Sequence, residues 1–200
     1  TGQEVVLDVA TGAGHNALSF APHVRRVVGL DLTHGMLAEA CGLARQRGAS
    51  NVTFCQGDSE RLPFANDRFD VVTCRIAPHH FPDVARAVQE MARVCQPGGY
   101  VAIVDNITPE DADTCTYINA FEILRDPSHH WAYPLSQWRQ FFTQAGLQLG
   151  TEEILPKAMH FQSWASRMGV GDAVVADLHQ STLLLTEALL TELPEKKPAP

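Results

Sequence analysis

The sequence predicts an α/β fold, built on a doubly wound, mostly parallel sheet with helices on both faces. Short runs of apolar, mostly β-branched residues recur through the first two-thirds of the chain, and segments with helical periodicity separate them. The runs are apolar throughout rather than alternating, which is typical of parallel strands buried on both faces. Alternation of such strands with helices requires right-handed βαβ crossovers.

Each apolar or periodic segment gives one expected element. Strands are expected over residues 5–9, 27–31, 52–55, 69–74, 100–105 and 147–154. Helices are expected from about residue 15 and over 34–47, 84–95, 111–125, 136–145 and most of 163–193. Ser136 is expected to cap the helix that runs to Ala145. The Pro97-Gly98-Gly99 turn is expected to end one helix and open the strand at Tyr100.

The order of these elements also predicts the domain organisation. Residues 1–155 are expected to form one ligand-binding domain, with a helical cap inserted at about 106–135. Residues 156–193 are expected to be a helical segment packed on that domain, and 194–200 a mobile tail. The sequence leaves the oligomeric state open.

Composition excludes several classes of function. The net charge is −8 and basic residues do not cluster, so a nucleic-acid partner is not expected. The chain lacks the run of about 20 apolar residues that spans a bilayer. Its first residues do not form a signal peptide, and a cytoplasmic location is expected. The five cysteines form no C-x-x-C pair, which favours reduced thiols and predicts no metal site.

A glycine-containing loop follows the first strand. Asp8 lies near the end of that strand, and Gly12 and Gly14 come just before the expected helix. Glycines let the backbone approach a ligand, and a helix N-terminus directs free N–H groups toward it. Asp31 closes the second strand about 20 residues later, where a carboxylate can accept both hydroxyls of a ribose. This spacing predicts a ligand that contains adenosine.

The acidic residues bear on which ligand it is. A dinucleotide fingerprint can be placed on residues 12–17, but the Asp8 carboxylate would repel a pyrophosphate. It suits an ammonium group instead, such as that of the methionine part of S-adenosylmethionine. Asp58 ends the third strand and could accept from an adenine amino group. An NAD(P)-dependent oxidoreductase remains the alternative, and calorimetry with both cofactors separates the two.

Four segments resemble the successive motifs of class I S-adenosylmethionine-dependent methyltransferases: residues 8–15, 29–37, 57–64 and 93–99. They are most similar to the ubiquinone/menaquinone-biosynthesis-type C-methyltransferases (the methyltransferase type 11 domain). The likeness runs in order over roughly residues 4–155. It implies a Rossmann-like fold, S-adenosyl-L-methionine as cofactor, and methyl transfer to a small molecule.

The resemblance also implies roles for particular residues. Ala10 stands where the family more often has glycine. The implied cofactor-binding residues are Asp8, Ala10, Gly12 and Gly14 at the methionine part, Asp31 at the ribose, Leu32 and Met36 at the adenine faces, Asp58 and Ser59 at the adenine edge, and Arg75 beside the cofactor.

Histidines supply the candidate catalytic residues. Ligands of a doubly wound sheet bind beyond the carboxyl ends of the strands, where His80 falls after the fourth strand. His129 lies in the expected cap. Either could act as the general base for a protonated acceptor, or could only hydrogen-bond its own loop. The acceptor is expected between Ala77–Phe81 and Asp126–Tyr133, touching at least one of these two histidines.

The nature of the acceptor is indicated only coarsely. Aromatic residues near these segments favour a small aromatic or apolar molecule: Phe81, Trp131, Tyr133 and Trp138. A non-catalytic module that binds S-adenosylmethionine, as a partner subunit would, is a further alternative.

Overall fold

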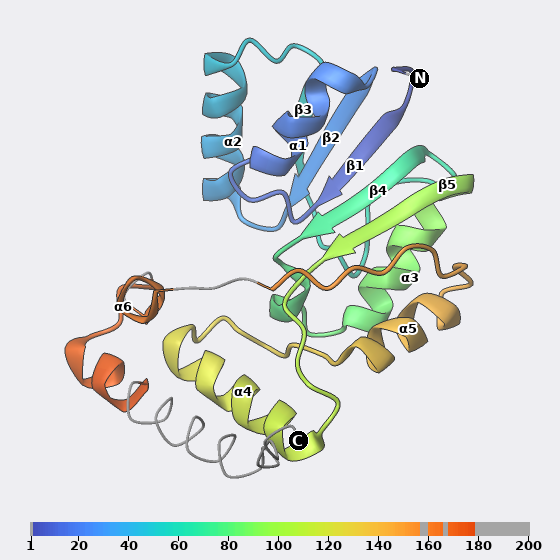
Figure 1. Ribbon diagram of the computed structural model, residues 1–200. Helices are drawn as coiled ribbons and strands as arrows, with labels where there is room; N and C mark the ends of the chain where they lie inside the picture. Colours follow the sequence, from blue (N-terminus) through green and yellow to red (C-terminus); the bar gives the residue numbers. More distant parts are fainter. Residues whose placement is uncertain (1, 157–159, 166–167, 179–200) are drawn as a thin grey trace, which may run out of the picture. The chain divides into compact units, whose positions relative to one another are not determined.

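A computed structural model of the chain describes residues 2–156, 160–165 and 168–178. Five strands form one parallel sheet in the order β3-β2-β1-β4-β5 (Figure 1). The strands are β1 (Val5–Val9), β2 (Arg26–Asp31), β3 (Val52–Gln56), β4 (Phe69–Arg75) and β5 (Cys95–Val104). The predicted doubly wound α/β fold is confirmed, with every pairing in this sheet parallel.

Helices and short 3-10 turns connect and follow these strands, and residues 172–178 are also helical. The labelled helices and turns are α1 (His15–Phe20), η1 (Ala21–His23), α2 (His34–Gln46), η2 (Pro78–His80), α3 (Val84–Val94), α4 (Ala112–Arg125), α5 (Leu135–Gln144) and α6 (Phe161–Ala165). Helix α5 is capped by Pro134. Ser136 is therefore not the cap that its sequence position suggested: it lies inside the helix, and its hydroxyl donates to Glu110 Oε2 at 2.5 Å.

The chain forms two compact units. The first holds the described residues up to Cys115 together with His130–Thr151, and so contains the whole sheet. The second holds Thr116–His129 and the described residues from Glu152 onward. Much of the expected helical segment 156–193, and all of the expected tail 194–200, lies outside the described residues. The predicted boundary at residue 155 stays a prediction.

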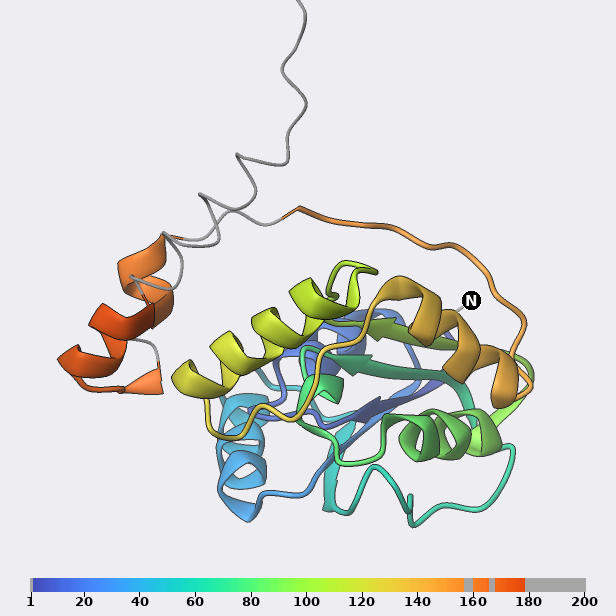
Figure 2. The ribbon, with the colours of Figure 1, turned by 90° about the horizontal axis from the view of Figure 1, so that it is seen from below.

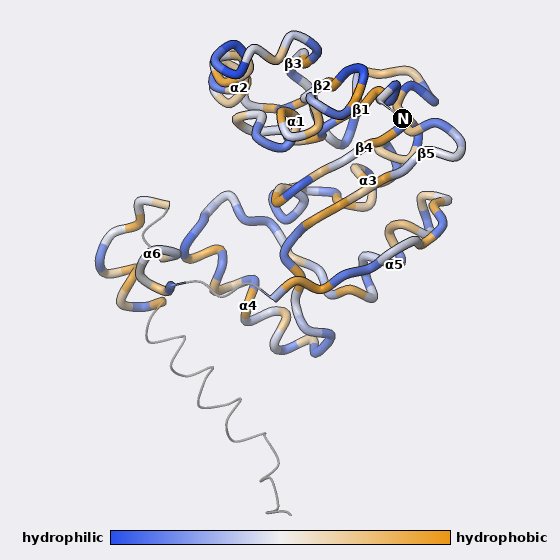
Figure 3. Tube along the Cα trace, turned by 45° about the horizontal axis from the view of Figure 1, so that its top comes forward, coloured by the Kyte–Doolittle hydropathy of each residue, from blue (hydrophilic) through white to orange (hydrophobic). Residues whose placement is uncertain are grey.

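The alternation of side chains along the strands divides the core between the two faces of the sheet. Helices α1 and α2 cover one face with a cluster formed by Val6, Ala17, Leu18, Val27, Ala44 and Val52. Helix α3 covers the other face, where the cluster includes Leu7, Val9, Val28, Leu30, Val72, Met91 and Val94. In the hydropathy colouring of Figure 3, orange hydrophobic stretches lie along the strands.

Helices α3 and α5 lie side by side (Figures 1 and 2). Val84 and Val88 of α3 pack against Trp138 and Phe141 of α5, and Tyr133 packs against the same cluster. Asp83 starts α3 by accepting the N–H of Arg86 at 2.9 Å. Tyr133 and Trp138 therefore contribute to this core. Their aromatic rings consequently give little support to the prediction of an aromatic or apolar methyl acceptor.

The Pro97-Gly98-Gly99 turn predicted before the fifth strand lies inside β5. Phe69 pairs with Cys95, and the next regular pair is Val71 with Tyr100, so residues 96–99 bulge opposite Asp70. The Asp70 carboxylate stabilises the bulge by accepting the Val5 N–H at 2.7 Å and the Gln96 side chain. The uninterrupted ladder begins at Tyr100, as expected from the sequence.

The strand predicted over 147–154 is wrong. Residues 147–156 have no regular secondary structure, and Leu149, Ile154 and Leu155 are exposed. A strand forms only where it has a pairing partner, so a locally favourable composition does not suffice. Gly150 lies within the segment, and glycine weakens a strand.

All five cysteines are free thiols. In the described part of the chain, no group of three or more His, Cys, Asp or Glu side chains is placed to hold a metal ion. None of the described helices is long and apolar enough to cross a membrane.

The close packing of β2 on β3 generates a stability prediction. A Cβ added at Gly29 would lie 2.6 Å from Phe54 Cδ1 and 3.0 Å from Thr11 Cγ2. Gly29→Ala is therefore expected to lower the free energy of unfolding by roughly 1–3 kcal/mol, the usual cost of overpacking a core. Gly42→Ala, inside α2 with nothing within 4 Å of the new methyl, should raise it by about 0.5–1 kcal/mol. Urea denaturation of both variants measures the difference, and equal effects would contradict this packing.

Candidate functional site

The carboxyl ends of β1, β2, β4 and β5 bring several acidic side chains together. Val9 pairs with Leu30 on one side and with Cys74 on the other, and Arg75 pairs with Val104. The thiol of Cys74 lies among these ends. Burial, and then the carboxylates of Asp8, Asp105 and Asp31, raise the pKa of Cys74 well above its ordinary value. Asp8 of β1, Asp31 at the end of β2 and Asp105, which directly follows β5, therefore all act on the same thiol.

Asp8 is buried, with 1% of its surface exposed, and its carboxylate holds the glycine loop. Oδ2 accepts the hydroxyl of Thr11 at 2.6 Å, and Oδ1 accepts the side-chain amide of Asn16 at 2.7 Å. Burial raises the pKa of Asp8, and the hydrogen bonds from Thr11, Asn16 and the Ala17 backbone, with the charge of Arg75, oppose that rise. Asp8 thus fastens the loop to the first turns of α1.

The loop backbone is left-handed at three positions: Ala10 (φ 53°), Gly12 (φ 55°) and Gly14 (φ 81°). A Cβ at Gly14 would lie 3.0 Å from both Ala40 Cβ and Phe54 Cζ, so this position requires glycine. A Cβ at Gly12 would meet nothing within 4 Å, so the space above it is open. The strain at Ala10, roughly 1–2 kcal/mol, lies directly beside this open space.

Asp31 links the glycine loop to the start of α2. Its Oδ2 accepts the Gly12 N–H and its Oδ1 accepts the Thr33 N–H, both at 2.8 Å. Each carboxylate oxygen can accept a second hydrogen bond, so two further donors can be bound. Two large apolar side chains follow it and are exposed, Leu32 at 67% and Met36 at 42%.

A hollow of about 590 Å³ lies at the carboxyl end of β3. Its lining residues are Gln56, Gly57, Asp58, Arg61, Leu62 and Pro63. Asp58 Oδ1 accepts the Glu60 N–H at 2.8 Å, and this interaction closes the turn that also carries Ser59. Asp58 and Ser59 were both predicted at the adenine edge, and of these two residues Asp58 lines the hollow.

Arg75 ends β4 with an exposed side chain, and a tightly held segment follows it. His79 donates its backbone N–H to Asp105 Oδ2 at 2.8 Å, and its Nδ1 lies 2.6 Å from Asp105 Oδ1. The His79 carbonyl accepts the N–H groups of His130 and Trp131 at 2.7 and 3.0 Å. Residue 79 therefore joins the ends of β4 and β5 to the segment that precedes α5.

The two histidines predicted to be catalytic lie in different settings. His80 is half-buried, and its ring centroid is 4.1 Å from that of His79. His129 belongs to the second unit, where it is buried and its Nε2 is 2.8 Å from Asn119 Oδ1 on α4. That contact gives His129 a structural role within its own unit.

Sequence reasoning missed the pairing of His79 with Asp105. Residues 100–105 were expected only to form a strand, with no partner assigned to Asp105. A signal was present, because Asp105 follows β5 in the way that Asp31 closes β2. Thr11 and Asn16, which donate to Asp8, were not predicted either.

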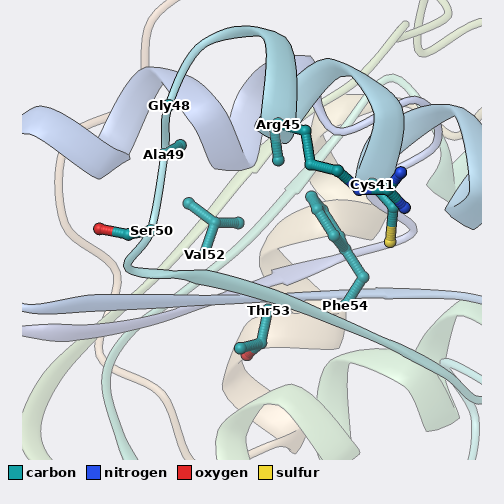
Figure 4. A pocket seen from close by; sticks show the side chains of 9 residues that line it. Cys41, Arg45, Gly48, Ala49, Ser50, Val52, Thr53 and Phe54 are labelled. Atoms are coloured by element: carbon teal, nitrogen blue, oxygen red, sulfur yellow. The ribbon is translucent and has the colours of Figure 1, made fainter.

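A second hollow, of about 540 Å³, lies between the end of α2 and the start of β3 (Figure 4). Its lining includes Cys41, Arg45, Ser50 and Thr53, and none of the predicted site residues. Phe54 points from β3 toward α2 in this view. Its ring also packs against Gly14, so this region supports the glycine loop from behind.

Comparison with known proteins agrees with this geometry. A family model described as a methyltransferase domain matches residues 7–103. The chain is 42% identical over 164 residues to the uncharacterized methyltransferase YcgJ of Bacillus subtilis, covering 82% of this chain and 65% of that relative. The crystal structure of YcgJ matches with a TM-score of 0.87 at 38% identity, covering 90% of this chain and 77% of that one. A demethylmenaquinone methyltransferase of Thermobifida fusca is 40% identical over 104 residues, 51% of this chain and 43% of the relative.

The buried carboxylate of Asp8 generates a prediction about stability and pH. The pKa of Asp8 is raised in the folded state, so folding disfavours its ionised form. The contribution of Asp8 to the free energy of unfolding therefore falls as the pH rises from the ordinary pKa of 3.8 through the pKa of the folded state. Asp8→Asn keeps the shape of the side chain, and the Thr11 hydroxyl, which donates to the carboxylate, can accept a hydrogen bond from the amide NH₂ instead. Subtracting the free energy of unfolding of wild type from that of Asp8→Asn should therefore give a more positive value at pH 7 than at pH 4, as measured by urea denaturation.

Glu39→Gln, a neutralisation on the exposed face of α2, serves as the control and should show no such difference. If Asp8→Asn were more strongly destabilised relative to wild type at pH 7 than at pH 4, the raised pKa of Asp8 would be contradicted.

Proposed function

The chain belongs to the class I S-adenosylmethionine-dependent methyltransferases, and from this premise we propose that it transfers a methyl group from S-adenosylmethionine to a small molecule. The observation that carries the proposal is the Asp31 carboxylate, fixed by the Gly12 and Thr33 N–H groups beside two exposed apolar side chains. An adenosine group requires an acceptor for its ribose hydroxyls next to apolar surface for its adenine ring, and a carboxylate beside exposed apolar side chains provides both.

The residues of this edge fit the cofactor part by part. Asp31 would accept the two ribose hydroxyls with its remaining lone pairs. Leu32 and Met36 would cover the adenine faces, a role that fits two large exposed apolar side chains. The hollow beside Asp58 would receive the adenine edge. The open space above Gly12 would receive the methionine part.

Electrostatics supports this cofactor over a dinucleotide. When bound, S-adenosylmethionine supplies a methyl group on a positively charged sulfonium, which makes that methyl group electrophilic. The carboxylates of Asp8, Asp31 and Asp105 favour a cation at this edge and oppose a pyrophosphate. The protein's own contribution is to hold the reacting groups in line and to exclude water.

The acceptor would lie beside the Ala77–Phe81 segment, past the end of β4. Exposed Ile76 and half-buried Trp131 border this segment and favour an aromatic or apolar molecule. The demethylmenaquinone methyltransferase relative matches about half the chain and supports this class of acceptor without identifying the molecule. Methyl transfer to a panel of quinols, phenols and amines tests the class. Cofactor binding without transfer to any acceptor would favour a non-catalytic module.

The role of Asp31 gives the sharpest test of cofactor binding. Asp31→Ala removes the hydrogen-bond acceptor for the ribose and loosens the Gly12 N–H. It should weaken binding of S-adenosylhomocysteine by about 1.5–3 kcal/mol, or roughly 10- to 150-fold, in isothermal titration. Glu39→Ala removes the same charge from the exposed surface of α2 and should leave the affinity unchanged within about twofold.

Two outcomes would count against this assignment. Full affinity in folded Asp31→Ala would show that the ribose binds elsewhere. Tighter binding of NAD than of S-adenosylhomocysteine to the wild-type chain would contradict the proposed cofactor.

A further inference from the structure

The segment between β3 and β4, residues 57–68, has almost no secondary structure of its own. Within it, Asp58 and Arg61 form only an isolated bridge. The segment nevertheless supplies most of the lining of the hollow at the end of β3. The backbone polar groups of such a connection need partners outside it, and a long connection without partners is mobile. Helix α3 provides these partners.

Glu90 on α3 is the first of them, and its side chain is 5% exposed. Its Oε2 accepts the Leu62 N–H at 2.9 Å and Arg93 Nη2 at 2.7 Å, while Oε1 accepts Arg93 Nε at 2.8 Å. The two contacts with Arg93 form the bidentate arrangement of a strong guanidinium–carboxylate pair. Hydrogen bonding from Arg93 above all, together with its charge and the Leu62 N–H, lowers the pKa of Glu90 in spite of burial. The carboxylate therefore stays charged.

Arg93 extends the pair to further points of the segment. Its Nη1 donates to the Phe64 carbonyl at 2.8 Å and to Asn66 Oδ1 at 2.9 Å, and its Nη2 donates to the Leu62 carbonyl at 3.1 Å. The N–H donors of a guanidinium point in several directions from one rigid plane, so a single side chain can bridge these acceptors. Arg93 begins the segment 93–99 that resembles a methyltransferase motif, but the cofactor contacts proposed above leave it without a role.

The first turn of α3 holds the other end of the segment. Glu60 Oε1 accepts the Asp83 N–H at 2.7 Å, and the Glu60 carbonyl accepts Arg86 Nε at 3.2 Å. Glu60 in turn donates its backbone N–H to Asp58 Oδ1 at 2.8 Å. The turn that carries Asp58 is thus anchored to one helix, through residue 60 and through residues 62–66. Asp58 itself is exposed, and its Oδ2 can accept a further hydrogen bond.

We propose that Glu90 and Arg93 are positioning residues for the recognition of adenine. The inference rests on the proposed function, in which the hollow beside Asp58 receives the adenine edge. Neither Glu90 nor Arg93 would touch the cofactor. They hold residues 62–66, so that Asp58 Oδ2 faces the 6-amino group of adenine and accepts a hydrogen bond from it. The pair therefore determines selectivity for this base rather than affinity for the rest of the cofactor.

Two ligands that differ in one group isolate this effect. S-adenosylhomocysteine carries the 6-amino group, and its purine riboside analogue has hydrogen in that place. Because the proposed hydrogen bond is to a charged acceptor, the wild type should bind S-adenosylhomocysteine at least about tenfold more tightly than the analogue in isothermal titration. Asp58→Asn should remove this preference. The Glu60 N–H can only donate, so the amide oxygen faces it and the amide NH₂ faces the ligand.

Arg93→Lys tests the positioning role itself. Lysine keeps a positive charge beside Glu90, but its single ammonium group cannot reach the acceptors at residues 62, 64 and 66 together. The preference for S-adenosylhomocysteine should fall to about threefold or less. The affinity for the analogue should stay within about twofold, because Asp31 and the glycine loop are distant from the substitution. In the ligand-free chain, the Leu62 N–H should exchange with solvent at least about tenfold faster than in the wild type, as measured by NMR.

Arg125→Lys is the matched control. Arg125 pairs with Glu122 at the same i, i+3 spacing as Arg93 with Glu90, but on α4, and it lines neither hollow. Both the preference between the two ligands and the exchange of the Leu62 N–H should stay as in the wild type.

Several results would overturn the proposal while S-adenosylhomocysteine still binds. They are equal affinity of the wild type for the two ligands, an unchanged preference in Asp58→Asn or in folded Arg93→Lys, and unchanged exchange at Leu62 in Arg93→Lys. An equal loss of affinity for both ligands in Arg93→Lys would also overturn it, because the pair would then serve only the stability of the fold. Failure of the wild type to bind either ligand would refute the proposed function, and the recognition of adenine with it.

Discussion

The structure depends on how carboxylates are stabilised at the carboxyl edge of a parallel sheet. Parallel pairing brings the ends of β1, β2, β4 and β5 to one edge, and with them Asp8, Asp31 and Asp105. Burying a charged carboxylate is costly unless strong hydrogen bonds compensate. Each of the three binds donors of the connecting loops, and at Asp8 these donors offset the cost of burial only in part. The charges that would attract a cationic ligand therefore also hold the loops in place.

The loops of the candidate site are therefore ordered by the protein alone. Asp31 holds Gly12 from β2, while Phe54 fills the space behind Gly14 from β3. The strain at Ala10 and Ile76 lies at the ends of β1 and β4, where the chain must turn away from the sheet. A site that is formed in advance loses little conformational freedom when a ligand binds, and methyl transfer depends mainly on such alignment.

The sequence predicted those features that follow from local patterns. Buried parallel strands are continuous apolar runs, so the five strands of the sheet and the position of Asp31 could be located. The segment from Leu147 is less apolar and has no pairing partner, and pairing is not a local property. The contact between His79 and Asp105 likewise depends on how the ends of two strands meet across 26 residues. The contact of His129 with Asn119 on α4 also depends on tertiary packing rather than on a local pattern.

The most direct test of the central claim is a crystal structure of the chain with S-adenosylhomocysteine bound. We expect both ribose hydroxyls on the Asp31 carboxylate, the adenine between Leu32 and Met36, and the Gly12 N–H still bound to Asp31 as it is here. The sulfur should then lie on the side of the edge where β4 ends. A ligand bound elsewhere, for example in the hollow lined by Cys41 and Arg45, would contradict it.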